Sequence, residues 1–177
     1  TQGIKFSARD LEMADLLAKA AKSKGLMKRK FVSKTPKNQS VNVTMEVIDV
    51  KKDYPDLWKQ GYREAWATPK HAGHPKNKII FDVNYIKQSS EAEIESVIVH
   101  ELAHIKDPSF VSPKLNARYS TDFKKFPLYT SINLSKDPAD AAKTFWNTYY
   151  LHPFEVNAIT PEVLGHMVKT TKQKGYL

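Results

Sequence analysis

The chain has 177 residues, of which 41% are hydrophobic and 27% charged, enough for one domain with an apolar core and short for two. It contains no cysteine, which excludes disulfides, thiol nucleophiles and cysteine-bound zinc and leaves His, Asp and Glu as metal-binding side chains. No apolar run reaches the length of a membrane span, and the net charge of +9 favours anionic partners such as nucleic acid only weakly.

The N-terminal part predicts a helix followed by a basic connector. Residues 7–24 place a Ser cap before Leu and Ala positions at helical spacing, and Gly25 follows them. Residues 22–37, KSKGLMKRKFVSKTPK, carry much of the excess positive charge without the interleaved aromatics of a single-strand binding groove. We therefore expect residues 1–40 to form a helix and a solvated connector.

The next part predicts a sheet. Val41, Val43, Met45 and Val47 alternate with other residues, as in a half-buried strand spanning 41–50. Two further strands are expected at 61–68 and 78–86, joined by a loop that carries His71 and His74. With the helix that follows, we expect residues 41–105 to form a small mixed sheet packed on a helix, which is an α+β fold.

Residues 93–108, EIESVIVHELAHIKDP, predict that helix. Ser89 or Ser90 can cap its start, and Asp107-Pro108 stops it. Apolar residues recur at helical spacing and form a stripe that would pack into a core: Ile94, Val97, Ile98, Leu102 and Ile105. The helix should therefore be rigid and partly buried.

The same helix carries a candidate metal site. His100 and His104 are four residues apart, so their side chains share one face and can bind one ion. Glu101 lies about a quarter turn from His100, where it can reach a water on that ion without becoming a ligand. Because the pattern H-E-x-x-H also arises by chance in ordinary helices, a third ligand has to decide between a metal site and two unremarkable histidines.

The C-terminal part predicts a loop and two helices. Residues 106–136 are irregular and long for a compact domain, so we expect them to shape a cleft. Residues 137–177 are expected to form two helices that carry the third ligand, the first starting at an Asp137 cap with Pro138 behind it.

Several residues are candidates for the third ligand. Asp107 suits a helix stop or a partner of a ligand histidine, and His71 and His74 read as exposed loop residues. The longer pattern H-E-x-x-H-x-x-G-x-x-H fails, because an Asp stands at its Gly position and a Phe at its third His position. Glu155 and His152 remain, although Glu155 also suits a helix dipole and His152 a helix cap or an oxyanion donor.

Two motifs together resemble a known family. HELAHIKDP at 100–108 and YYLHPFEVNA at 149–158 match the patterns HELxHxxDP and YxxxPxExxA. These patterns are typical of short, phage-associated proteins similar to zincin metallopeptidases of the gluzincin kind, whose third ligand is a glutamate on a later helix. The resemblance covers about half of the chain, roughly residues 78–160, and the first seventy residues match nothing in it.

The resemblance implies a zincin-like fold and a zinc-dependent peptidase. It implies Zn²⁺ on His100, His104 and Glu155, with Glu101 as the general base. Tyr149 and His152 are candidates for stabilising the oxyanion. It also implies a polypeptide substrate held along a strand beside the helix, either 61–68 or 78–86.

Three alternatives stay open. The chain can be a zinc-binding virion or interaction protein without turnover, a basic nucleic-acid-associated protease resembling the SprT-like proteins, or an enzyme acting on cell-wall peptides. The first is disfavoured by the intact Glu101, and the second by the lack of a cysteine-bound zinc ribbon. Since the chain begins at Thr1 and shows no signal peptide, its compartment is open, with a viral or secreted origin compatible with the resemblance.

Overall fold

A computed structural model of the chain describes residues 7–35 and 37–106. The predictions for residues 107–177, including the cleft-shaping loop, the C-terminal helices and every candidate in the second motif, lie outside the described residues. The helices are α1 (Ala8–Lys24), α2 (Val50–Asp53), α3 (Pro55–Lys59), α4 (Val83–Gln88) and α5 (Glu91–Lys106), with a 3-10 turn η1 (Lys70–Ala72). The strands are β1 (Met27–Lys34), β2 (Ser40–Ile48), β3 (Ala65–Thr68) and β4 (Lys78–Asp82).

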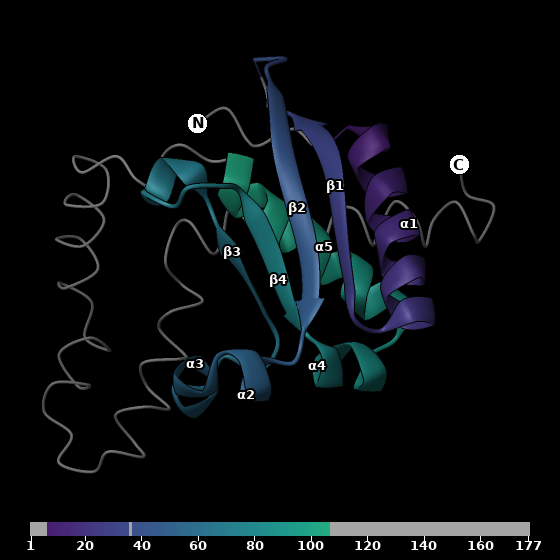
Figure 1. Ribbon diagram of the computed structural model, residues 1–177. Helices are drawn as coiled ribbons and strands as arrows, with labels where there is room; N and C mark the ends of the chain where they lie inside the picture. Colours follow the sequence, from purple (N-terminus) through teal and green to yellow (C-terminus); the bar gives the residue numbers. More distant parts are fainter. Residues whose placement is uncertain (1–6, 36, 107–177) are drawn as a thin grey trace, which may run out of the picture.

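The four strands form one mixed sheet in the order β1-β2-β4-β3. β1 pairs antiparallel with β2 and β3 pairs antiparallel with β4, whereas β2 and β4 run parallel with Thr44 opposite Lys78. In Figure 1, α5 crosses behind the sheet and α1 lies beside it, and the two helices contact each other. The expected α+β fold with a small mixed sheet packed on the histidine helix is therefore confirmed.

α1 forms where the cap and the apolar spacing predict it. The Ser7 hydroxyl accepts a hydrogen bond from the Asp10 amide at 3.2 Å, and the Asp10 carboxylate accepts one from the Ser7 amide at 3.1 Å. At the other end, Gly25 adopts a positive φ of 68°, and its amide donates to the Ala21 carbonyl at 2.8 Å. Glycine favours this conformation because it has no Cβ, and it ends the helix there.

The expected solvated connector is wrong, because residues 27–34 are strand β1. Phe31 and Ser33 are buried, while the charged residues on either side of them are exposed. β1 lies at one edge of the sheet order, and edge strands commonly carry charged side chains that discourage pairing with other chains. The basic composition of this stretch therefore belongs to an edge strand.

The strand predicted at 78–86 is also too long. β4 ends at Asp82, and α4 begins at Val83. Val83 and Ile86 are both buried and three residues apart, which fits one face of a helix as well as it fits a buried strand. Of the strand predicted at 61–68, only residues 65–68 form a strand, β3. The short helices α2 and α3 were not predicted.

The core lies between the sheet and the two long helices. α1 contributes Ala14, Leu17, Ala18 and Ala21, the sheet contributes Val43, Met45, Val47, Ile79 and Phe81, and α5 contributes Ile94, Ile98, Leu102 and Ile105. The apolar stripe predicted for the histidine helix thus packs as expected, with Val97 partly buried beside it. Over residues 7–35 and 37–106, no helix is both long and apolar enough to cross a membrane.

Candidate metal centre

The start of α5 is fixed by Ser90, one of its two predicted caps. The Ser90 hydroxyl accepts a hydrogen bond from the Glu93 amide at 3.2 Å, and the Glu93 carboxylate accepts from the Ser90 amide at 2.6 Å. This reciprocal pair satisfies two amides that have no partner within the helix. The helix phase, and with it the direction of each later side chain, is therefore set from its first turn.

His100 and His104 face each other one turn apart. Their Nε2 atoms lie 3.2 Å apart, and the two rings are nearly perpendicular, with an interplanar angle of 80°. His104 is buried at 6% exposed, and His100 is half-buried. The Nε2 atoms of the two rings therefore point toward each other.

The separation of the two nitrogens fits a tetrahedral zinc site. Zinc–imidazole bonds of about 2.0–2.1 Å at a tetrahedral angle place two ligand nitrogens about 3.3–3.4 Å apart. The 3.2 Å observed between the Nε2 atoms of His100 and His104 is close to that separation. The same distance also fits an N–H···N hydrogen bond between two neutral imidazoles. A metal titration separates these two interpretations.

Glu101 lies next to His100 in the chain and is buried, at 8% exposed. Carboxylates are seldom buried to this degree without partners. The position directly after the first histidine is the one that the general base takes in an H-E-x-x-H helix. The structure therefore brings the rings of His100 and His104 together, while the role of Glu101 as a base stays a prediction.

A third ligand is not among the described residues. Within residues 7–35 and 37–106, no three His, Asp or Glu side chains form a group that could hold a metal ion. Glu155, the predicted third ligand, lies outside the described residues, as do His152 and Tyr149. The described part of the chain thus contains three of the predicted site residues, His100, Glu101 and His104.

His71 has a role that the sequence did not reveal. It was expected to be an exposed loop residue, but it is half-buried in η1, and its Nε2 lies 3.1 Å from the carbonyl oxygens of both His104 and Ile105. Since carbonyls only accept, Nε2 carries the proton. The residue four positions after His104 is Pro108, which has no amide hydrogen, so the His104 carbonyl lacks the donor that it would have within a helix. His74, in contrast, is exposed as expected.

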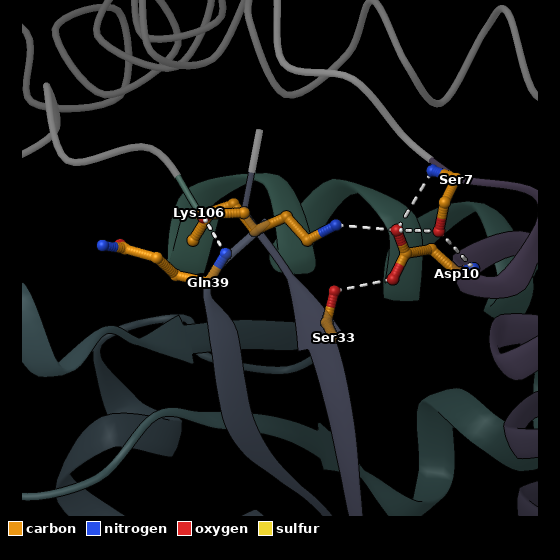
Figure 2. A network of polar contacts seen from close by, with 6 residues as sticks. Ser7, Asp10, Ser33, Gln39 and Lys106 are labelled. Atoms are coloured by element: carbon orange, nitrogen blue, oxygen red, sulfur yellow. Dashed lines mark hydrogen bonds and ion pairs between the residues drawn. The ribbon is translucent and has the colours of Figure 1, made fainter. Parts of the chain in front are cut away.

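A buried ion pair holds the end of the same turn. The Lys106 ammonium donates to the Asp10 carboxylate at 2.7 Å (Figure 2). The same carboxylate accepts hydrogen bonds from the hydroxyls of Ser33 at 2.6 Å and Ser7 at 2.8 Å. Burial disfavours the charged carboxylate, but the bonds from Lys106, Ser33 and Ser7 outweigh it and hold the pKa of Asp10 below its ordinary value. The sequence analysis did not single out Asp10, because its partner is 96 residues away.

No protein-family model matches the chain, and no curated protein or solved structure matches it either. The resemblance to the zincin metallopeptidases therefore rests on the two sequence motifs, and the geometry of α5 is an independent observation.

Proposed function

We propose that the protein is a zincin-like, zinc-dependent metallopeptidase that hydrolyses peptide bonds. The observation that carries this proposal is the 3.2 Å separation between the Nε2 atoms of His100 and His104. Glu101, which follows His100 in the chain, is buried. The helix that presents them is capped by side chains at its first turn and held by side chains from elsewhere in the fold at its last. A rigid helix is what a preorganised metal site needs.

The ligands in this proposal are His100, His104 and Glu155. Two imidazoles and one carboxylate form a catalytic set that leaves one coordination position open. When bound there, zinc polarises the scissile carbonyl and lowers the pKa of a water molecule toward neutrality. The short distance between the Nε2 atoms of His100 and His104 supports this ligand set.

Glu101 moves the proton. Its carboxylate takes a proton from the attacking water as the water oxygen bonds to the carbonyl carbon. It then delivers this proton to the amine as the carbon–nitrogen bond breaks, which leaves one new carboxyl group and one free amine. Tyr149 or His152 donates a hydrogen bond to the oxyanion that forms in between.

β3 is the candidate for holding an extended polypeptide substrate. It is the last strand in the sheet order and contacts α5 directly. An extended peptide can pair its backbone with an edge strand and so lie along the metal helix. The other predicted strand, β4, is paired on both sides, by β2 and β3, and is unsuited to this role.

The test is zinc content and peptide cleavage measured on the same preparations. We expect one zinc per wild-type chain, much weaker binding in Glu155→Ala, and full zinc with cleavage lost in Glu101→Gln. His74→Ala is the matched histidine control, since His74 is exposed, and should keep both zinc and cleavage. If the wild-type protein cannot be loaded with zinc, the two imidazoles are a hydrogen-bonded pair and the proposal is wrong.

Two other results would change the proposal. Wild-type protein that holds zinc but cleaves no member of a peptide library would support a zinc-binding virion or interaction protein. Cleavage that depends on added DNA, together with a gel shift lost at moderate salt, would support a nucleic-acid-associated protease, because contacts to phosphate weaken steeply with salt.

A further inference from the structure

We propose that Asp10 is a positioning residue for the metal centre, and that its buried ion pair with Lys106 fixes the last turn of α5, where His104 lies. The inference rests on the proposed function and deepens it, because it gives the N-terminal helix a part in shaping the site. That helix lies outside the stretch that carries the resemblance to metallopeptidases.

The ion pair joins parts of the chain that are far apart in sequence. Lys106 is the last residue of α5 that the structure describes and stands two residues after His104, while Asp10 lies in the first turn of α1. The side chains are 0% and 5% exposed, and the Nζ–Oδ2 distance is 2.7 Å. A lysine that is removed from water to this extent needs its partner, so its position follows that of the carboxylate.

The carboxylate is itself held in place from two elements. Oδ2 also accepts from the Ser7 hydroxyl and the Ser7 amide, which form the cap of α1, and Oδ1 accepts from the Ser33 hydroxyl on β1. Figure 2 shows these groups converging on Asp10 from separate segments. Because both oxygens are occupied, the acceptor is oriented before it meets the lysine.

This location is where a helix needs restraint. Pro108 cannot donate a hydrogen bond to the His104 carbonyl, so this part of α5 lacks a restraint that its earlier turns have. The imidazole of His104 extends from that turn. A metal ligand must be held within about 0.5 Å of its productive position. Lys106 is anchored by Asp10, and the carbonyls of His104 and Ile105 are anchored by His71. Two independent contacts therefore fix the turn that carries the second ligand.

A buried ion pair is well suited to positioning. Such pairs often contribute less to stability than apolar replacements would, because both charges lose their water, but they have defined distances and directions. An apolar contact between α1 and α5 would hold the helices together without fixing the last turn. This distinction separates positioning from simple stabilisation in an experiment.

The experiment compares Asp10→Asn and Lys106→Met with Leu17→Ala as the matched control. Leu17 packs from the same helix into the same core, so its truncation destabilises α1 without touching the ion pair. The first measurement is amide hydrogen exchange in the metal-free proteins, expressed as the rate at residues 103–106 relative to residues 95–98. We expect this ratio to rise at least about tenfold in the two ion-pair variants and to stay unchanged in the control.

The second measurement is zinc affinity, determined by competition with a chromophoric chelator. Groups that hydrogen-bond directly to a metal ligand typically change metal affinity by about 10–100-fold. Asp10 and Lys106 act on His104 through the backbone, so we expect Asp10→Asn and Lys106→Met to weaken zinc binding by about tenfold, the lower end of that range. Leu17→Ala, corrected for its unfolded fraction, should stay within about twofold of the wild type. If Asp10→Asn does not fold, Ser33→Ala removes a single hydrogen bond to the same carboxylate and should raise the exchange ratio about threefold.

An exchange ratio and a zinc affinity that match the wild type in the ion-pair variants would overturn the inference, as would equal changes in Leu17→Ala. Failure of the proposed function looks different, because the wild-type protein itself would then bind no zinc. In that case the exchange ratio in the metal-free proteins still decides whether Asp10 fixes this turn.

Discussion

At the scale of single residues, His71 and His74 form a natural comparison. His71→Ala removes the donor that serves the carbonyls of His104 and Ile105, whereas His74 is exposed. We expect His71→Ala to lower the free energy of unfolding by about 1–2 kcal/mol, because two carbonyls at the end of α5 lose a hydrogen bond. His74→Ala should stay within about 0.5 kcal/mol of the wild type. Urea unfolding followed by circular dichroism measures both, and equal values for the two variants would contradict the capping role.

Asp10 gives the stability of the protein a defined pH dependence. Its pKa is lowered in the folded state, so its contribution is present above the ordinary aspartate pKa of 3.8 and is lost as the pH falls through the folded-state pKa. At neutral pH, Asp10→Asn should cost about 3–5 kcal/mol, because Lys106 is left buried without its counter-charge. The gap between wild type and variant should shrink below about pH 4.

Unfolding curves of both proteins over a pH series test this prediction. Other acidic groups titrate alike in the two proteins, so they cancel in the difference. A gap that stays constant from neutral pH down through the ordinary aspartate range would show that the carboxylate charge contributes nothing.

The motif residues could be predicted from sequence, and the residues that support them could not. His100 and His104 are four apart on a helix, and helix geometry alone brings their rings together. Asp10 meets Lys106 across 96 residues and His71 meets His104 across 33, and neither pairing has a local signal. Such pairings follow from how α1 and η1 pack on α5, which depends on the whole fold.

At the scale of elements, two neighbouring leucines on α1 differ in burial and can be used to test which face of the helix packs into the core. Leu17 is 5% exposed and lies in the core, while Leu16 is 62% exposed. We expect Leu17→Ala to destabilise the protein by about 2–5 kcal/mol through lost burial and the cavity that remains. Leu16→Ala should change the free energy of unfolding by no more than about 0.5 kcal/mol. Thermal or urea unfolding of the pair checks this, and a costly Leu16→Ala would mean that the exposed face of α1 has a partner.

Elements were predictable where cap and periodicity agreed. α1 and α5 each combine a serine cap with an apolar stripe, and both appear within two residues of their predicted limits. β1 was missed because its lysines and arginine mask the alternation of Phe31 and Ser33. α4 was read as strand because its two buried residues fit either period over so short a length.

At the scale of the whole molecule, zinc binding should stabilise the fold. A ligand that binds only the folded state adds about 2.7 kcal/mol when its free concentration is about 100 times its dissociation constant. We expect zinc to raise, and a chelator to lower, the midpoint of unfolding of the wild type. The shift should vanish in a His100→Ala, His104→Ala double variant, and a shift of equal size there would place the bound zinc elsewhere in the chain.

The parallel pairing of β2 with β4 has a consequence for how the chain reaches this structure. β1 and β2 are joined by a short turn, in which the Thr35 amide donates to the Gln39 carbonyl at 2.9 Å, so this hairpin can close quickly. β4 can join β2 only after the segment 49–77 has looped round, and such non-local pairing slows folding because its entropy is lost before any contact forms. The hairpin should therefore form early, and the sheet edge beside α5, which is built on β4, should form late.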